Sequence, residues 1–363
     1  MIRIRFLPAL ACLAIAPFCG SCSQSDPASA AQPAAKAVAA DVERMLIPDK
    51  SWTCGMAGGI PKPESGTLLL EAKMPLDNFY DVGKTPYGQR QVAVTQAGTM
   101  SGPKIQGDVL AGGLDFELTL PNGVVEVEQI FVLRTSDGRY AIMRNAGTGV
   151  SGNDVRVVFD VEAPAAGNFA WLNTGTYVGR RTIDAANKTM SLSIYDVANA
   201  PQTGAVHPIR IMKPANLPAQ PWDYRKADPS ERQGERIVTE SVQLGASQAI
   251  AGGKRGARNI IPITGGTLAG EISGKVLFGG ADYQSPTAGP AIDARYLWQT
   301  SDGQVIIVRN TGPFNGLIPT FETSVDGKFA WLNTGKYLSS PPGFGGGGGG
   351  GLSISMFKSA ASQ

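Results

Sequence analysis

The sequence predicts an all-β protein made of two tandem antiparallel β-barrel domains related by internal duplication. Three observations predict it: 46 glycines and 25 prolines in 363 residues, stretches that alternate apolar with polar residues, and a set of motifs that occurs twice in the same order. Glycine and proline are frequent in turns and rare inside helices, so this composition favours many short strands. The length also exceeds that of one typical domain.

Alternation of apolar and polar residues marks a strand in each half of the chain. Residues 123–135 alternate apolar side chains with two glutamates, and residues 292–299 alternate them with Asp293 and Arg295. This period of two is typical of a sheet with unlike faces. Each stretch leads into Ser-Asp-Gly, which predicts a turn and a β-hairpin. Many short antiparallel strands suit a sandwich or a barrel, and closure into a barrel removes exposed strand edges.

The duplication is visible in a heptapeptide that occurs twice without change. Phe-Ala-Trp-Leu-Asn-Thr-Gly stands at residues 169–175 and again at 329–335. Further pairs precede it in matching order: Gly88-Gln89-Arg90 with Gly256-Ala257-Arg258, Gly112-Gly113-Leu114-Asp115 with Gly279-Gly280-Ala281-Asp282, Thr135-Ser136-Asp137-Gly138 with Thr300-Ser301-Asp302-Gly303, and Arg144-Asn145 with Arg309-Asn310. Collinear motifs indicate one copy over residues 65–197 and a second over residues 234–358.

Composition divides the rest of the chain into four further segments. We expect a signal peptide at 1–22, which alternatively extends to residue 30, and a flexible tether with an N-terminal extension at 23–64. Residues 198–233 form a proline-rich connector, which proline keeps extended. Residues 359–363 form a tail. The glycine run at 343–351 predicts a loop before the last strand, because a phosphate-binding loop would instead open a helix.

The first residues predict export from the cytoplasm. Arg3 and Arg5 precede an apolar stretch at 6–18 that is too short to span a bilayer and fits a signal-peptide core. Cleavage after Ala30 would release the protein, whereas cleavage before Cys22 would leave a thiol that carries a lipid. Both remain open, so the expected location is the periplasm, the medium, or a membrane reached only through a lipid anchor.

Charge, cysteine and histidine usage exclude several function classes. Lys and Arg number 32 against 30 Asp and Glu, and the basic residues are scattered, so no nucleic-acid partner is expected. Cys54 is the one cysteine beyond the export segment, which excludes an internal disulfide and favours a small buried side chain over a reactive thiol. The single histidine, His207, lies in the connector. A Ser-His-Asp triad or a histidine-ligated zinc is therefore not expected, and neither a metal nor a cofactor is implied.

The second copy resembles a known bacterial family. The residues that carry the resemblance are Arg258 to Thr264, Gly265-Gly266-Thr267, Gly279-Gly280-Ala281-Asp282-Tyr283, Asp293-Ala294-Arg295-Tyr296, Asp302-Gly303, Phe321-Glu322-Thr323 and Phe329-Ala330-Trp331-Leu332-Asn333. They resemble domain of unknown function 3237 (DUF3237), which implies a small β-barrel per copy and names no reaction. The first copy is less similar: Ile130 stands where Arg295 stands, and residues 159–161 stand where residues 321–323 stand. This difference predicts that the first copy has lost a site.

The candidate site residues are charged side chains of the second copy: Arg258, Asp282, Asp293, Arg295 and Glu322. Strand geometry puts Asp293 and Arg295 on one face, roughly 6 to 7 Å apart. If that face lines the barrel, an acid and an arginine converge in a cavity of low dielectric constant that can orient a ligand or transfer a proton. If it faces water, they form an ordinary surface pair, which the apolar opposite face favours.

Trp331 and Asn333 are further candidates, because alternation places them on one face of a strand. Their recurrence in both copies favours a role in the fold, with the indole filling the barrel and the amide closing a turn. A tryptophan that stacks on a ligand is the alternative.

Three functions fit these observations. The leading hypothesis is an exported protein that binds a small, partly apolar molecule in a barrel, chiefly the second. The alternative is a cofactor-free lyase, isomerase or hydrolase that uses Asp293 or Glu322 as acid or base, with Arg295 steadying an anion. The third is a structural envelope protein without a ligand, in which the two copies pack as an intrachain pseudo-dimer.

Overall fold

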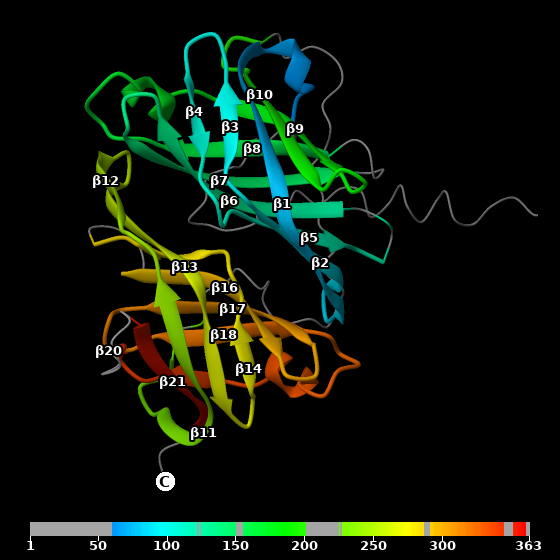
Figure 1. Cartoon of the computed structure of the whole chain (residues 1–363), viewed down its shortest axis with the longest axis vertical. Coiled ribbons are helices and arrows are strands. Elements are labelled where there is room, and N and C mark those ends of the chain that lie inside the picture. The colour runs from blue at the N-terminus through cyan, green and yellow to red at the C-terminus, as the bar shows by residue number, and fades with distance from the viewer. Residues whose placement is uncertain are drawn as a thin grey trace, which may run out of the picture. The chain divides into compact units, whose positions relative to one another are not determined.

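The computed structural model describes residues 60–121, 123, 125–149, 155–200, 225, 227–286, 291–344 and 351–360. Strands dominate these residues, which contain no α-helix and three 3-10 turns, η1 (Pro63–Ser65), η2 (Ala170–Asn173) and η3 (Ala330–Asn333) (Figure 1). None of the described segments is a helix long and apolar enough to cross a membrane. The predicted signal peptide with Cys22, as well as Cys54 and His207, lies outside the described residues.

Each copy forms its own antiparallel sheet, so the predicted all-β class is confirmed. The first copy contains β1 (Thr67–Thr85), β2 (Gly88–Thr95), β3 (Gly98–Ser101), β4 (Gln106–Val109), β5 (Leu114–Thr119), β6 (Val125–Thr135), β7 (Tyr140–Gly149), β8 (Val155–Glu162), β9 (Tyr177–Asp184) and β10 (Thr189–Asp196). The second contains β11 (Arg232–Leu244), β12 (Gln248–Gly253), β13 (Gly256–Gly270), β14 (Gly274–Val276), β15 (Ala281–Gln284), β16 (Ile292–Thr300), β17 (Val305–Gly312), β18 (Ile318–Thr323), β19 (Tyr337–Ser339), β20 (Gly343–Phe344) and β21 (Gly351–Ala360).

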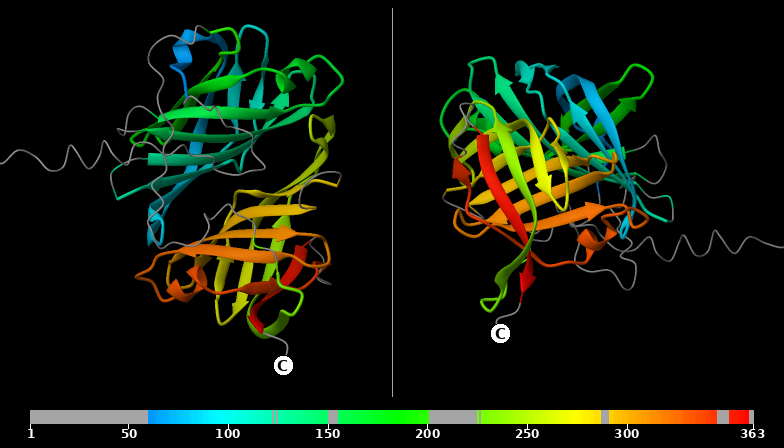
Figure 2. Two further views of the ribbon diagram at one scale, coloured as in Figure 1. Left: turned by 180° about the vertical axis from the view of Figure 1, so that it is seen from behind. Right: turned by 60° about the horizontal axis from the view of Figure 1, so that its bottom comes forward.

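The first sheet closes into a barrel. Its strand order is β10-β9-β8-β7-β6-β4-β3-β1-β2-β5, and β10 also pairs with β1 while β6 pairs with β5. The long strand β1 changes partners along its length, and register shifts at Leu68/Leu70 and Leu76/Asn78 mark where its ladders are irregular. Figure 2 shows the strands of each copy curving round into a barrel. Closure leaves few free strand edges.

The second sheet has the same plan with a weaker seam. Its order is β18-β17-β16-β14-β13-β11-β21-β19. In the first barrel, β8 and β9 pair over four residues, from Arg156↔Arg180 to Phe159↔Tyr177. At the equivalent seam, β18 and β19 form no ladder, and the Ser339 N–H and hydroxyl each donate to the Leu317 carbonyl oxygen at 3.0 Å. The second barrel is therefore held less firmly at this seam.

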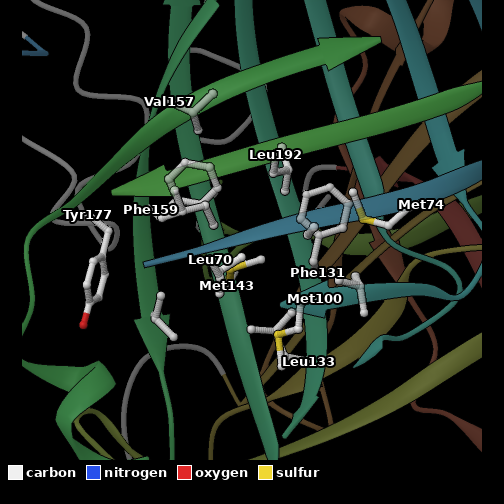
Figure 3. Packing of buried hydrophobic residues seen from close by; sticks show 14 of the residues in the cluster. Leu70, Met74, Met100, Phe131, Leu133, Met143, Val157, Phe159, Tyr177 and Leu192 are labelled. Carbon is white, nitrogen blue, oxygen red and sulfur yellow. The ribbon is translucent and has the colours of Figure 1, made fainter. Parts of the chain in front are cut away.

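Apolar side chains fill each barrel. Figure 3 shows the first core, in which Phe131, Leu133 and Met143 point inward from neighbouring strands toward Leu70 and Leu192. The equivalent cluster of the second barrel includes Tyr296, Trp298, Phe321, Tyr337 and Met356. The face of β16 that carries Tyr296 and Trp298 thus packs inward, as its apolar character predicts.

A third apolar cluster joins the two barrels. It contains Val92, Leu114, Phe116, Ile130, Val132 and Ile142 of the first copy and Ile260, Ala281, Tyr283, Leu297, Val305 and Ile307 of the second. The repeated Gly-Gly turns meet here, since the Gly280 N–H donates to the Gly112 carbonyl oxygen at 2.7 Å. Matching strands of the two copies therefore supply this interface, as expected of an isologous contact.

Candidate functional site

A small apolar pocket lies inside the second barrel. Its walls are Val242, Leu244, Ile263, Ile292, Ala294, Leu317, Pro342, Leu352 and Ile354, and its polar side chains are Glu240, Asp282, Tyr296 and Asn310. The cavity volume is about 30 Å³, enough for a water molecule or two because one needs roughly 10–15 Å³. Its lining thus combines apolar walls with a few polar side chains that point into a small space.

Glu240 brings a carboxyl group into this interior. It is fully buried, its Oε1 accepts a hydrogen bond from the Tyr296 hydroxyl at 2.7 Å, and its Oε2 accepts one from Trp298 Nε1 at 2.9 Å. Burial raises the pKa of Glu240 to about 7, against the opposing effect of the two donors. Glu240 therefore places a carboxyl group with a raised pKa among apolar side chains.

Asp282 follows the Gly-Gly turn that the repeat predicted. Gly279 and Gly280 have φ of 111° and 78°, and a Cβ on Gly280 would lie 1.9 Å from the Arg295 carbonyl oxygen, so the turn requires glycine. Asp282 Oδ2 accepts from Gln284 Nε2 at 2.9 Å, whereas its buried Oδ1 has no partner among the described residues. Burial raises the pKa of Asp282 to about 6, Gln284 opposes this, and the charge of Asp293 adds to it.

Asn310 belongs to a row of three residues that are neighbours across β15, β16 and β17. In this row Asp282 pairs with Ala294, and Ala294 pairs with Asn310. The Asn310 side chain is buried, and neither of its amide atoms has a hydrogen-bond partner within the described part of the chain. Because Ala294 is small, the middle of the row is open, and Asp282 and Asn310 face the pocket with hydrogen-bonding capacity to spare.

The first barrel closes the equivalent row with its own side chains. The equivalent residues are Asp115, Gln129 and Asn145, which pair in the same register. Gln129 Nε2 donates to Asp115 Oδ2 at 2.5 Å, and Asn145 Nδ2 donates to Gln129 Oε1 at 3.1 Å. The glutamine amide therefore gives partners to the Asp115 carboxylate and to Asn145 Nδ2, whereas Asn145 Oδ1 has none among the described residues.

An arginine also blocks the first barrel. Arg181 Nε and Nη2 donate to the two Asp115 oxygens at 2.9 and 3.1 Å, and Nη2 donates to Glu117 Oε2 at 2.6 Å. A cavity of about 550 Å³ is lined by Arg181 and Glu117 together with Leu76 and Ile183, which belong to or pack against the core of the first barrel. Arg181 stands four residues after Tyr177, whereas Pro341 stands four residues after the matching Tyr337. The second barrel therefore has no arginine at this position.

Asp293 and Arg295 lie neither inside the barrel nor in water, so both expected placements were wrong. Their face of β16 packs against the first copy, where Asp293 is 2% and Arg295 0% exposed. Arg295 Nε and Nη2 donate to the Asp293 carboxylate at 3.0 and 3.1 Å, and Nη1 donates to Glu128 Oε1. Arg309 Nη2 reaches Glu128 Oε2 at 2.9 Å. The reason is that the outer face of one barrel serves as an interface to the other.

Arg258 and Glu322 take part in two matched ion pairs across the same interface. Arg258 Nε and Nη2 donate to Glu162 at 3.1 and 3.0 Å. Arg90 Nε and Nη2 donate to Glu322 at 2.8 and 3.0 Å. Arg90 and Arg258 stand at equivalent places in the repeat, so each copy gives an arginine to the other copy's glutamate.

The strand registers also correct the expected alignment of residues 159–161 with residues 321–323. Glu162 pairs with Ile142, and Glu322 pairs with the equivalent Ile307. Glu162 is therefore the counterpart of Glu322, two residues beyond the match first expected. Phe159 and Phe321, which the expected alignment matched, are not equivalent. Phe159 pairs with Asn145, whereas Phe321 pairs with Val308.

Trp331 and Asn333 belong to the 3-10 turn η3 and not to a strand, which corrects their expected placement. Asn333 Oδ1 accepts from the Thr323 N–H at 2.9 Å, and its Nδ2 donates to the Thr323 carbonyl at 3.0 Å. In the first copy Asn173 makes the same two bonds to Ala163. Trp331 packs on Tyr337 with ring centroids 6.1 Å apart. Neither residue lines the pocket of the second barrel.

Of the candidate residues named from the sequence, Asp282 alone lines this pocket. Glu240, Tyr296 and Asn310 were missed. A signal for Glu240 was present, because it replaces an apolar residue at an inward position between Val238 and Val242. No group of three potential metal ligands occurs among the residues that the structure describes.

Comparison with known proteins finds the same family in both copies. The model of the family "Protein of unknown function (DUF3237)" matches residues 65–155 and 233–317. A UPF0311 protein of Bradyrhizobium diazoefficiens is 46% identical over 59 residues, which cover 16% of this chain and 39% of that protein. A UPF0311 protein of Rhodopseudomonas palustris is 50% identical over 79 residues, which cover 21% and 52%. The chain thus spans about half the length of these relatives or less. A β-barrel-like protein of Acinetobacter baumannii aligns with a TM-score of 0.32 and 19% identity, over 36% of this chain and 94% of that chain.

Proposed function

Since the chain carries two tandem copies of the DUF3237 family domain, we propose that it is an exported protein that binds a small, partly apolar molecule in its second barrel. The observation that carries this is the apolar pocket in which Asp282 Oδ1 and the Asn310 amide have no hydrogen-bond partner among the described residues. A buried polar group left unsatisfied costs about 1–3 kcal/mol. A ligand that supplies the missing bonds recovers that cost. Export is supported by Arg3, Arg5 and the apolar stretch at 6–18.

The cavity volume limits the ligand in this conformation. About 30 Å³ holds a water molecule or two, so a ligand of several heavy atoms needs the walls to separate. Leu317 lines the pocket, and its carbonyl oxygen accepts bonds from the Ser339 N–H and the Ser339 hydroxyl next to β18 and β19, which form no ladder. Separation of the wall at this seam would break these two hydrogen bonds and no strand ladder.

The test is NMR of isoleucine and leucine methyl groups in the mature protein, titrated with 1-butanol and 2-butanone. We expect saturable shifts of Ile292, Leu317 and Ile354, which line the pocket, and no shift of Leu192 in the core of the first barrel. The control is Ala294→Leu, which fills the pocket and should abolish the shifts. Saturable binding in the first barrel alone, or in neither barrel, would refute the proposal.

A second candidate function is acid–base catalysis without a cofactor. It is favoured by two carboxyl groups in one pocket, with the pKa of Asp282 at about 6 and that of Glu240 at about 7. A base near the working pH is efficient in proton transfer. Asp293 and Glu322, the candidates named from the sequence, are instead held in ion pairs. This moves the proposed acid–base role to the pocket.

Deuterium exchange of 2-butanone α-protons tests this second candidate. The wild-type protein should accelerate exchange, Asp282→Asn should abolish the acceleration, and Asp302→Asn, in a turn at the surface, should retain it. No acceleration by the wild type, or equal acceleration by Asp282→Asn, would dismiss it. Failure of both candidates leaves the third hypothesis, a structural envelope protein without a ligand.

A further inference from the structure

The first barrel contains an amide group at the place where the second has its pocket. Gln129 lies between Asp115 and Asn145. Its Nε2 donates to Asp115 Oδ2 at 2.5 Å, and its Oε1 accepts from Asn145 Nδ2 at 3.1 Å. One carboxamide thus uses its N–H toward a carboxylate and its carbonyl toward an amide N–H. All three side chains are buried.

The second barrel keeps both ends of this row and lacks the middle. Asp282, Ala294 and Asn310 pair in the same register as Asp115, Gln129 and Asn145. Replacing glutamine by alanine removes the side chain beyond Cβ, which amounts to an acetamide group. The atoms that face the gap, Asp282 Oδ1 and the Asn310 amide, have no partner in the described structure.

We propose that the second barrel recognises a small compound with a primary or secondary carboxamide, bound between Asp282 and Asn310 as the Gln129 amide is bound in the first barrel. The ligand N–H donates to Asp282 Oδ1, and its carbonyl oxygen accepts from Asn310 Nδ2. This inference rests on the proposed function, since it names the ligand class of the same pocket. The alkyl part of the ligand lies against Ile292, Leu317 and Ile354.

The chemistry of the row separates an amide from other head groups. A ketone offers an acceptor to Asn310 but leaves Asp282 without a donor. A carboxylate brings a second negative charge to Asp282, which is unfavourable because no arginine of the described residues hydrogen-bonds Asp282 as Arg181 does Asp115 in the first barrel. An amide alone among these offers a donor to Asp282 and an acceptor to Asn310 without adding a charge.

The closing experiment compares butanamide with 2-pentanone and butanoate at pH 8, using the methyl shifts of Ile292, Leu317 and Ile354. 2-Pentanone has the size of butanamide but carries a methyl in place of the NH₂ group. We expect butanamide to bind the wild-type protein at least tenfold more tightly than either of the others. Equal affinity of butanamide and 2-pentanone would overturn the amide inference and leave the proposed function standing.

The melting temperature of an Ala294 variant tests the inferred geometry without a ligand. Ala294→Gln places the first barrel's amide in the gap, so it should abolish butanamide binding and raise the melting temperature above that of Ala294→Leu, which has similar bulk and no amide. A melting temperature no higher than that of Ala294→Leu would contradict the inferred geometry. If none of the three compounds shifts the methyl groups, the proposed function and the inference both fail.

Discussion

The two barrels share a strand plan and differ in what their interiors do with the same polar row. In the first, Arg181 and Gln129 neutralise and hydrogen-bond Asp115. In the second, Asp282 has no arginine partner within the described part of the chain and faces a pocket beside Ala294. One copy thus fills the middle of this row with a side chain, and the other leaves Asp282 Oδ1 and the Asn310 amide without a partner among the described residues. A carboxyl group at the same position of the two copies thus has contacts that its neighbours decide.

The two barrels also differ around Glu240, where the second interior is polar and the first is apolar. Glu240 occupies the inward position of β11 that Ala72 occupies in β1, as the ladders to β21 and β10 show. Its two donors, Tyr296 and Trp298, replace Phe131 and Leu133 of the first barrel. The first core is entirely apolar at these places, whereas the second contains a buried carboxyl group with two hydrogen bonds.

The largest expected effect concerns the two arginines that cross the interface. Arg90→Ala leaves Glu322 buried with one hydroxyl donor, Thr85, so it should cost about 3–5 kcal/mol of unfolding free energy. Arg258→Ala should cost at least about 1 kcal/mol less, because Glu162 keeps an ion pair with Arg255 at 2.8 Å. Chemical denaturation measures both variants, and equal costs would show that the two ion pairs are equivalent despite their neighbours.

The next effect is the pH dependence that Glu240 gives to the second barrel. The pKa of Glu240 is raised from 4.5 to about 7 in the folded protein, so the folded state binds more protons than the unfolded state between these values. The stability contribution is therefore present at low pH and lost as the pH rises to 7. Glu240→Gln should remove this loss, worth roughly 2–3 kcal/mol.

Denaturation of the wild type and Glu240→Gln at pH 5 and pH 8 measures this change. The matched control is Glu71→Gln, on an exposed position of β1 in the first barrel, which should retain the wild-type pH dependence. An unchanged pH dependence in Glu240→Gln would mean that the buried carboxyl does not titrate in this range.

Opening the first barrel should have a smaller cost. Gln129→Ala removes the partner of the buried Asn145 amide, while Asp115 keeps Arg181, so we expect a loss of about 2 kcal/mol. Ala294→Gln, the reverse change in the second barrel, should increase stability. Melting temperatures of the two variants measure the opposite signs, and a stable Gln129→Ala protein would show that the amide row is not needed in the first barrel.

The smallest effect tests the part of the repeat that has not diverged. Asn173→Ala and Asn333→Ala each remove two hydrogen bonds to a backbone amide and carbonyl, so both should cost about 1 kcal/mol. Denaturation of both variants measures the costs, which should agree within about 0.5 kcal/mol. Weakened ligand binding in Asn333→Ala would instead favour the alternative of a binding role for this turn.

Local patterns determined the all-β class, the duplication and the family, because alternation, Ser-Asp-Gly turns and the Gly-Gly turn depend on neighbouring residues. The same patterns placed Asp282 among the candidates. They also put Tyr296 and Trp298 on the inward face of a strand, as the second core shows. These conclusions need no knowledge of which strands meet.

The tertiary structure alone decided what packs against the face of β16 that carries Asp293 and Arg295. Alternation gives two faces, and it cannot tell water from a second barrel, so Asp293 and Arg295 were expected inside or in solvent and lie in an interface. The pocket likewise depends on residues from β11, β15, β16 and β17 that meet only when the barrel closes. The physical reason is that burial and the pairing of charges belong to contacts between segments distant in the chain, which no local spacing encodes.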